Sequence, residues 1–314
     1  MACFNFGEAN DFNIFLFGNQ TQSNVDSEGR VAVGGNASYN NYGIGNTLPV
    51  SLTRADLIVG GNMNIIGGTN FSGNSVISPT GTVIQYTMTN NNGVPGQPLV
   101  GSPINFAGDQ IYLTCASLAW AALTPTGTVS VNFGQLVLTG FDPVLNIFNF
   151  DAENIAGTGF TLETLNGINI VAPLGSTILI NITGNNTGFG SYQIFRNGMS
   201  ATGADGQFIV WNFPQALNLF NMNISIKGSI LAPLAQWWAV GFGNVEGTFI
   251  ANNLINTMGT LEAHNFPFLG CLPDVCSATS SSTTSTTSTT TTTTSTSTST
   301  TSTSTSTTST STST

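Results

Sequence analysis

The sequence has very little charge. Lys and Arg total 4 of its 314 residues and Asp and Glu total 14. Charged residues therefore make up 6% of the chain, against about 25% in an average protein. Four basic side chains are too few to neutralise a nucleic-acid backbone or to hold a chain on an anionic membrane. We therefore expect no nucleic-acid partner.

Long hydrophobic runs are also missing. No run of about 18 apolar residues occurs, so the sequence predicts no transmembrane segment. The most apolar region, 230–240, is interrupted by Pro233 and Gln236. The first residues, MACFNFGEANDF, lack the basic and apolar regions of a signal peptide, so this chain shows no leader. A cytosolic protein and a secreted protein given without its leader both fit this start.

Catalytic groups are scarce. The single histidine, His264, has no G-x-S-x-G motif beside it, and no Gly-rich segment has the pattern of a phosphate loop. The spacing of Cys271 and Cys276 does not match a zinc site. Glycoside hydrolysis needs two carboxylates. The candidates are Asp151 with Glu153, and Glu246 and Glu262, which could share a face on adjacent coils, although surface acids are the simpler interpretation. We expect a protein that is not an enzyme and uses no cofactor or metal.

Three features favour an extracellular protein. The cysteines are even in number, six N-x-S/T sequons occur, and the last residues are almost pure Ser and Thr. The candidate N-glycosylation sites are Asn19, Asn36, Asn70, Asn181, Asn185 and Asn223. The candidate disulfide residues are Cys3, Cys115, Cys271 and Cys276. Their pairing stays open, because Cys271 and Cys276 could close a local loop or one of them could reach Cys3 or Cys115.

One change of composition divides the chain. Residues 277–314 have no apolar cluster and no charge, so nothing offsets the entropy cost of ordering them. This composition predicts a disordered, Ser/Thr-rich, mucin-like stalk. Residues 1–276 then form the folded domain.

Internal repeats predict the architecture of residues 1–276. IKGSILA at 226–232 matches VEGTFIA at 245–251, and AVGGN at 32–36 recurs as IVGGN at 58–62. Short strands recurring about every 20 residues, with Gly at the corners, are typical of a solenoid. We predict a mainly β protein, a right-handed β-helix, with Lys227 and Glu246 on neighbouring coils. A β-sandwich with chance similarity is the alternative.

One segment has the spacing of a helix. Phe106, Leu113 and Trp120 recur at helical intervals over 106–123, and Pro125 lies just beyond. We expect this α-helix to pack along the side of the β-helix.

Aromatic side chains provide the remaining binding chemistry, because their rings pack on the apolar faces of sugars. The candidate ligand-binding residues are Trp237, Trp238, Trp211 and Tyr192. Neighbouring residues in a strand face opposite ways, so we expect one of Trp237 and Trp238 to be exposed. The alternative is that both belong to the core or anchor a loop.

Several ordered motifs together resemble the choice-of-anchor A domain family. They are ANDFNIFLFGN (9–19), SEGRVAVGGNASYNNYGIG (27–45), ADLIVGGNMNI (55–65), INFAGDQIYL (104–113), VWNFPQA (210–216), IKGSILAPLA (226–235), VEGTFIAN (245–252) and EAHNFPFLG (262–270). The resemblance implies a β-helical, non-enzymatic, extracellular domain that is held on a surface by a C-terminal anchor or stalk and is adhesive. Some members of the family look like wall lectins that bind cellulose or chitin.

We therefore expect an extracellular adhesin, of the cell surface or wall, that binds a neutral polysaccharide such as cellulose or chitin. A purely structural coat or wall subunit is the first alternative. Ice binding would need Thr-x-Thr motifs ranked on successive coils, a ranking that Thr87–Thr89 does not show in the folded part. A glycoside hydrolase would need two carboxylates, as discussed above.

Overall fold

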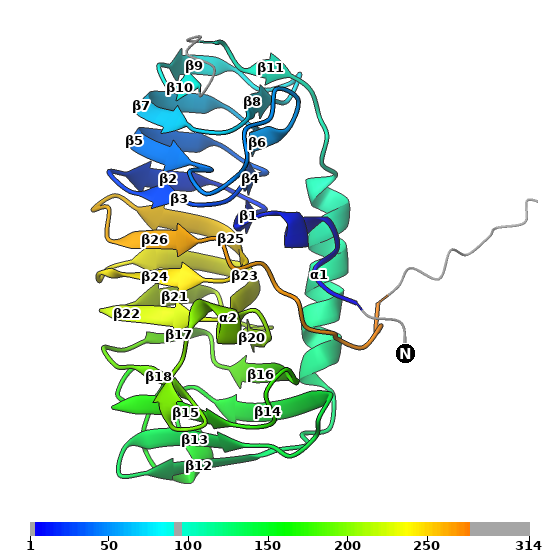
Figure 1. The fold of residues 1–314 in the computed structure, drawn as a ribbon, viewed down its shortest axis with the longest axis vertical. Coiled ribbons are helices and arrows are strands. Elements are labelled where there is room, and N and C mark those ends of the chain that lie inside the picture. The colour runs from blue at the N-terminus through cyan, green and yellow to red at the C-terminus, as the bar shows by residue number, and fades with distance from the viewer. Residues whose placement is uncertain (1–3, 91–95, 277–314) are drawn as a thin grey trace, which may run out of the picture. The chain divides into compact units, whose positions relative to one another are not determined.

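The computed structural model describes residues 4–90 and 96–276. These residues form a parallel β-helix with one long α-helix along its side, which confirms the predicted fold class (Figure 1). The predicted stalk at 277–314 and Cys3 lie outside the described residues.

Three columns of stacked strands run along the β-helix, and we call their outward surfaces faces A, B and C. Face A consists of β14 (Leu145–Asp151), β16 (Thr177–Thr183), β20 (Ile209–Asn212), the first parts of β23 (Ser229–Ala239) and β25 (Phe249–Asn256), β1 (Ile14–Leu16), β4 (Val31–Val33), β6 (Ala55–Val59), β8 (Asn74–Ile77) and β11 (Leu99–Val100).

Faces B and C use the strands that follow in each coil. Face B consists of β17 (Asn186–Phe189), β21 (Asn218–Asn221), the second parts of β23 and β25, β2 (Gln20–Ser23), the first parts of β5 (Ala37–Ile44) and β7 (Met63–Asn70), and β9 (Val83–Tyr86). Face C consists of β22 (Ile224–Lys227), β24 (Gly243–Glu246), β26 (Leu261–His264), β3 (Asp26–Ser27), the second parts of β5 and β7, and β10 (Thr89–Asn90).

A smaller sheet closes one end of the β-helix. It consists of β12 (Thr128–Asn132), β13 (Gln135–Thr139), β15 (Gly167–Val171), β18 (Ile194–Arg196) and β19 (Met199–Ser200). Strands β12 and β13 pair antiparallel, unlike the parallel strands of the three columns. The remaining elements are short turns of helix at Gly7–Asp11, Ile155–Gly157 and α2 (Gly203–Gly206).

The two sequence repeats stack as predicted. Val245 lies opposite Ile226, Glu246 opposite Lys227 and Phe249 opposite Ile230. In the second repeat, Val33 lies opposite Val59. Each matching pair therefore occupies the same position on adjacent coils, and the carboxylate of Glu246 pairs with the ammonium of Lys227.

The order of the coils differs from a simple continuous winding. The coil that begins with β1 stacks on the coil of β25 and β26, so segments near opposite ends of the folded domain are neighbours (Figure 1). The chain winds from this junction to β11, returns along the side of the β-helix through a segment that contains α1 (Phe106–Ala121), and winds back from β12.

The outward side chains of face A explain the position of α1. Leu231, Ile250, Phe15, Ala32 and Ile58 occupy one register row, and all are buried. The helix buries Leu113, Ala116, Ser117 and Trp120 against this face, as the helical spacing predicts. Covering apolar side chains of this kind stabilises the fold by about 25 cal/mol for each Å² removed from water.

Polar groups beneath α1 are also paired. Asn149, Asn181 and Asn212 lie on successive coils. Asn181 Nδ2 donates to Asn149 Oδ1, and Asn212 Nδ2 donates to Asn181 Oδ1, each at 2.8 Å. Asn181 Nδ2 donates to Trp120 O, and Asn212 Nδ2 donates to Ser117 O. This row satisfies helix carbonyls that would otherwise be buried without a donor.

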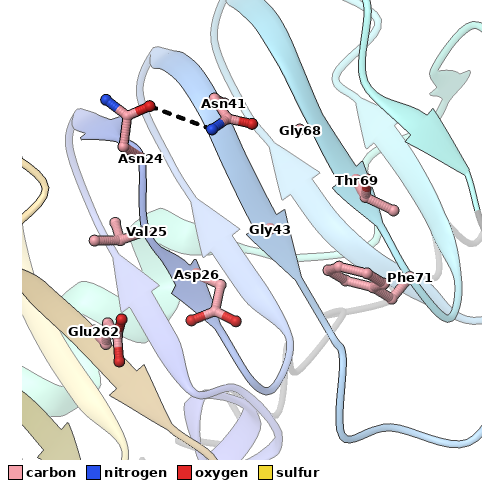
Figure 2. Close-up of a pocket in the computed structure, with 9 residues that line it drawn as sticks. All are labelled: Asn24, Val25, Asp26, Asn41, Gly43, Gly68, Thr69, Phe71 and Glu262. Atoms are coloured by element: carbon pink, nitrogen blue, oxygen red, sulfur yellow. Dashed lines mark hydrogen bonds between the residues drawn. The ribbon is translucent and has the colours of Figure 1, made fainter.

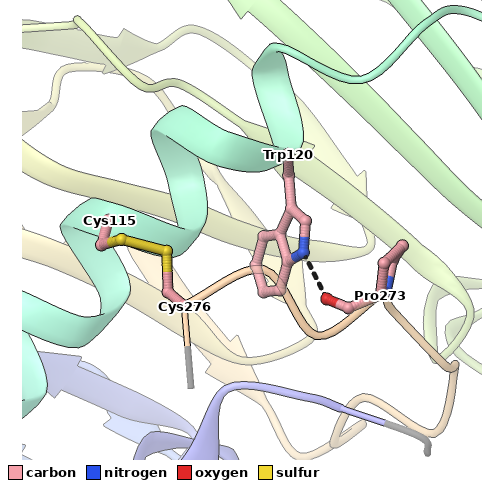
Figure 3. Close-up of a disulfide and its surroundings, with 4 residues drawn as sticks. All are labelled: Cys115, Trp120, Pro273 and Cys276. Atoms are coloured by element: carbon pink, nitrogen blue, oxygen red, sulfur yellow. Dashed lines mark hydrogen bonds between the residues drawn. A yellow bond between two sulfur atoms is a disulfide. The ribbon is translucent and has the colours of Figure 1, made fainter. Parts of the chain in front are cut away.

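A disulfide fixes the C-terminal segment to the middle of α1. Cys115 is bonded to Cys276, with 6.0 Å between the Cα atoms, and Trp120 Nε1 donates to Pro273 O at 2.9 Å (Figure 3). This pairing excludes the local Cys271–Cys276 loop, and Cys271 is itself disulfide-bonded. The bond therefore ties two segments that are 161 residues apart in the sequence.

Asn13 supports the junction between the first and last coils. Its buried amide donates to Gly247 O and to His264 O, both at 3.0 Å, and its oxygen accepts from Gly29 N at 3.1 Å. We predict that Asn13→Ala lowers the free energy of unfolding by about 2–3 kcal/mol, because the buried Gly247 O and Gly29 N–H lose their hydrogen-bond partner. Urea unfolding measures this difference.

The matched control is Asn40→Ala, which removes an exposed amide on β5. We expect a change within about 0.5 kcal/mol for this variant. Equal effects of the two substitutions would contradict the importance of the junction.

Candidate adhesive surface

The three faces differ in what they offer to a ligand. Face A lies under α1. Face C carries Asp26, Lys227, Glu246, Glu262 and His264. The strands of face B contain no charged residue along their whole column. Face B is therefore an uncovered and uncharged surface.

Amide side chains follow the edge of face B at which its strands begin. The row runs through Asn186, Asn218, Gln236, Asn253, Asn19, Asn36 and Asn62. Asn19 Oδ1 accepts from Asn36 N, and Asn36 Oδ1 accepts from Asn62 N, each at 2.8 Å. These bonds satisfy the corner backbone, so the Asn-rich composition has a structural cause as well as a solvating one.

The central row of face B has two halves. In the first half, Phe220, Trp238 and Ile255 stack on successive coils. The row then continues as Thr21, Ser38, Asn64 and Gln85. Successive coils are about 4.8 Å apart, so one half presents apolar rings and chains while the other presents evenly spaced hydroxyl and amide groups.

The four predicted aromatic residues have different positions. Trp237, Trp211 and Tyr192 are buried, and they belong to the interior of the β-helix. Trp237 Nε1 donates to Asn221 Oδ1 at 3.0 Å, and Tyr192 Oη donates to Leu162 O at 2.8 Å. Trp238 is 41% exposed and points outward from face B, as strand alternation requires. Of the four aromatic side chains, only Trp238 is exposed.

Sequence reasoning missed the polar half of face B. Strands β2 and β5 have the sequences QTQS and ASYNNYGI, which lack an apolar run. Their buried side chains are partly polar, since Tyr39 Oη donates to Gln20 Oε1 at 2.5 Å and Asn256 Nδ2 donates to Gln22 Oε1 at 2.7 Å. The available signal was the alternation of residue types in QTQS at 20–23, where Gln20 and Gln22 are buried and Thr21 and Ser23 are partly exposed.

Glu246 and Glu262, which were weighed above as a catalytic pair, lie on face C. Glu246 and Glu262 are on the adjacent strands β24 and β26, as predicted. Glu246 pairs with Lys227, and Glu262 Oε2 lies 3.4 Å from His264 Nε2. Within residues 4–90 and 96–276, no group of three or more His, Cys, Asp or Glu residues could hold a metal ion.

A hollow lies on face C beside these charges. Asp26, Phe71, Thr69 and Glu262 surround it, together with the amides of Asn24 and Asn41 and the backbone of Gly43 and Gly68 (Figure 2). Its volume is about 340 Å³. Asp26 and Glu262 are on neighbouring strands, because Ser27 pairs with Ala263.

The sequence of the chain matches a family model over residues 5–265, and the family is described as "Putative Ice-binding-like adhesive domain". The chain belongs to this adhesive family. Its adhesive β-helical character confirms the coarser part of the resemblance noted from the motifs. The family matched is the ice-binding-like one and not specifically choice-of-anchor A.

Known proteins similar to this adhesive domain are distant. No curated protein matches it. Among solved structures it is similar to an ice-binding protein from an Antarctic biological consortium, with 13% identity, coverage of 84% of this chain and 90% of that one, and a TM-score of 0.36. A domain of ice-binding protein 1 from Shewanella frigidimarina has 14% identity, 84% and 98% coverage and a TM-score of 0.36.

A third similar structure is an ice-binding protein from the Antarctic ascomycete Antarctomyces psychrotrophicus, with 12% identity, 82% and 98% coverage and a TM-score of 0.31. Within the part of the chain that the structure describes, no helix is long and apolar enough to cross a membrane.

The adhesive domain separates the six sequons into two groups. Asn70 and Asn181 are buried, and their amide nitrogens donate to Ser75 Oγ and to Trp120 O. A glycan needs that nitrogen at the surface, so the fold has no room for one at either residue. The exposed candidates are Asn19, Asn36, Asn185 and Asn223.

The opposed carboxylates on face C make the stability of the adhesive domain depend on pH. Burial, and then the charges of Glu262 and Glu28, raise the pKa of Asp26, while His264 lowers it less. A carboxyl with a raised pKa gives stability that is complete below its unfolded pKa and is lost as the pH rises through its folded pKa. Asp26 therefore lowers the free energy of unfolding as the pH rises above about 4.

We predict that Asp26→Asn removes this loss and raises the free energy of unfolding at neutral pH. The expected gain is roughly 0.2–1 kcal/mol, the scale of a directly opposed cross-strand pair. Urea unfolding at a series of pH values measures it.

Asp142→Asn is the control, because backbone N–H groups of Val144 and Leu145 lower the pKa of Asp142. That carboxylate gives stability above its unfolded pKa, which is lost as the pH falls. A gain at neutral pH in the control variant as well would show that the opposed pair is not the cause.

Proposed function

We propose that this adhesive domain binds a neutral, extended polysaccharide, such as cellulose or chitin, through face B. The observation that carries the proposal is the absence of charge along the whole uncovered column of face B strands. An uncharged surface gives no electrostatic steering toward ionic partners and little dependence on salt.

The two halves of face B match the two kinds of surface on a sugar polymer. Trp238 and Phe220 are neighbours on adjacent coils, so their rings offer a platform for the C–H faces of sugar rings. Thr21 and Ser38 continue the same row with hydroxyl groups that both donate and accept hydrogen bonds. Each contact is weak, and many repeated contacts along a fixed row give avidity.

The setting of the domain is part of the same proposal. The even number of cysteines, the bonded state of Cys115 and Cys276, and the four exposed sequons support a secreted or surface protein. We further propose that residues 277–314 serve as a Ser/Thr-rich stalk. We also propose that the domain is related to choice-of-anchor A proteins, a relationship that the ordered motifs in the sequence support.

The first test is retention on insoluble cellulose and chitin. We predict that Trp238→Ala weakens binding about fivefold to tenfold, because one stacking platform is lost. Ser38→Glu should weaken it further, since it adds a charge to the polar half. Binding of the wild-type chain should survive about 0.5 M salt, at which charges are screened beyond about 4 Å.

The control for retention is Phe141→Ala, which removes an 82% exposed ring outside face B. Equal retention of the wild-type chain and all three variants would remove face B from the proposal. Self-assembly without any added glycan, with no retention on either polymer, would favour the structural coat subunit instead.

Ice is the second candidate ligand, and one observation favours it. Thr21 and Ser23 on β2 lie beside Ser38 and Asn40 on β5, which gives a regular array of polar groups. Its spacing is about 4.8 Å between coils and about 6.7 Å along each strand. Such an array can order water at fixed intervals.

Ice crystal shaping and recrystallisation assays test this candidate. If ice is the ligand, the wild-type chain shapes ice crystals, Ser38→Tyr abolishes the effect by disturbing the flat polar half, and Trp238→Ala retains it. A wild-type chain that leaves crystal growth unchanged would eliminate ice.

A further inference from the structure

Face C contains a polar track that the proposed function does not use. Thr89, Thr69, Gly43, Asp26, Glu262, Asn244 and Ser225 occupy successive coils in one register row. Seven coils at about 4.8 Å give a length of about 29 Å. The track is therefore long enough for several linked sugar units.

Two adjoining hollows lie along this track. The first, at Asp26, has a volume of about 340 Å³, and the second, at Asn244, about 370 Å³. They share Asn24, Val25 and Glu262 as lining residues. Both volumes fall at the small end of the range for ligand pockets, roughly 300–1,000 Å³. Glu262 thus lies between two neighbouring subsites.

Glycine forms the floor of both hollows for reasons of fold. At Gly68 an added Cβ would lie 2.1 Å from Tyr42 O, and at Gly243 it would lie 1.8 Å from Ile224 O. Gly43 separates Asp26 from Phe71, since an added Cβ would lie 3.0 Å from Asp26 Cβ and 3.1 Å from Phe71 Cε2. The backbone of the neighbouring coil thus excludes a side chain at Gly68 and Gly243, whereas Gly43 faces the space between the Asp26 and Phe71 side chains.

Each hollow has one exposed aromatic ring in its wall. Phe71 is 39% exposed beside the first hollow, and Phe242 is 71% exposed beside the second. Phe71 lies across the hollow from the carboxylate of Glu262 and next to Thr69 (Figure 2). Apolar rings therefore lie beside strong hydrogen-bond acceptors.

The polar groups have the chemistry of a polyol site. The Asp26 and Glu262 carboxylates are side by side and only accept hydrogen bonds when ionised, so they suit donors such as vicinal hydroxyls. Asn24 and Asn41 add amide groups, which already bond each other at 3.2 Å. The two carboxylates repel an anionic polymer here.

We propose that this track of face C is a second binding site, for a linear, neutral oligosaccharide that lies along the β-helix axis. Phe71 and Phe242 stack on sugar rings, and Asp26, Glu262 and Asn244 accept hydrogen bonds from their hydroxyls. The site is separate from face B, so a single chain could hold a polymer surface on one side and a free glycan strand on the other.

Calorimetric titration of the full chain with cellohexaose and with N-acetylchitohexaose tests this site. Phe71→Ala and Glu262→Gln should each weaken binding of the hexasaccharide about tenfold. Gly43→Ala should weaken it too, because the added methyl occupies the floor between Asp26 and Phe71. Phe141→Ala, which removes an exposed ring outside the track, should leave the affinity unchanged, and circular dichroism should show every variant folded.

The outcomes separate this site from face B. Loss of hexasaccharide binding in Trp238→Ala, with Phe71→Ala unchanged, would overturn the second site and assign the binding to face B. A wild-type chain that binds neither hexasaccharide would overturn the second site as well. Face B is tested separately, by retention of the chain on solid cellulose and chitin. Binding that disappears with a calcium chelator would identify the carboxylates as a cation site and overturn the direct polyol contact.

Discussion

The fold depends on the register of parallel strands from one coil to the next. Backbone hydrogen bonds join each coil to its neighbours, so a residue that lies on a given face is stacked on residues of the same face above and below. A one-residue slip would turn every side chain to the opposite side. Gly34 and Gly60 illustrate how tight this stacking is, because an added Cβ at Gly60 would lie 2.4 Å from Gly34 O.

This register gives each face its own chemistry. The outward row of face A is apolar, and α1 covers it. Face B repeats amides at its edge and neutral groups along its centre. Face C carries charged residues near its middle, among them the Lys227–Glu246 pair. In a chain with 6% charged residues, the strands of face B thus carry none of them, which is the arrangement that the proposed uncharged ligand would need.

The first and last coils close the structure at one junction. Strand β25 pairs with β1 and β2, and β26 pairs with β3. Asn13 bonds across this junction, and the opposed Asp26 and Glu262 lie on it. The candidate oligosaccharide track therefore exists only when both halves of the chain are docked, since its central carboxylates come from the two different halves.

Sequence patterns predicted much of the fold from particular residues. The repeats around Lys227 and Glu246, and around Val33 and Val59, identified coils that are true neighbours. The spacing of Leu113 and Trp120 identified the helix and its buried side. The polar strands β2 and β5 were not predicted. Buried side-chain hydrogen bonds such as the one between Tyr39 and Gln20 stabilise them, and a hydrophobic pattern does not reveal such bonds.

The sequence by itself determined the local unit, a short strand with glycine or asparagine at its corners, because backbone conformation and side-chain alternation act between near neighbours in the chain. Only the tertiary structure decided which aromatic rings face outward and that Cys115 meets Cys276. It also decided that the first coil stacks on the last. Those contacts join residues far apart in the sequence, and they follow from how the coils, the helix and the C-terminal segment pack together.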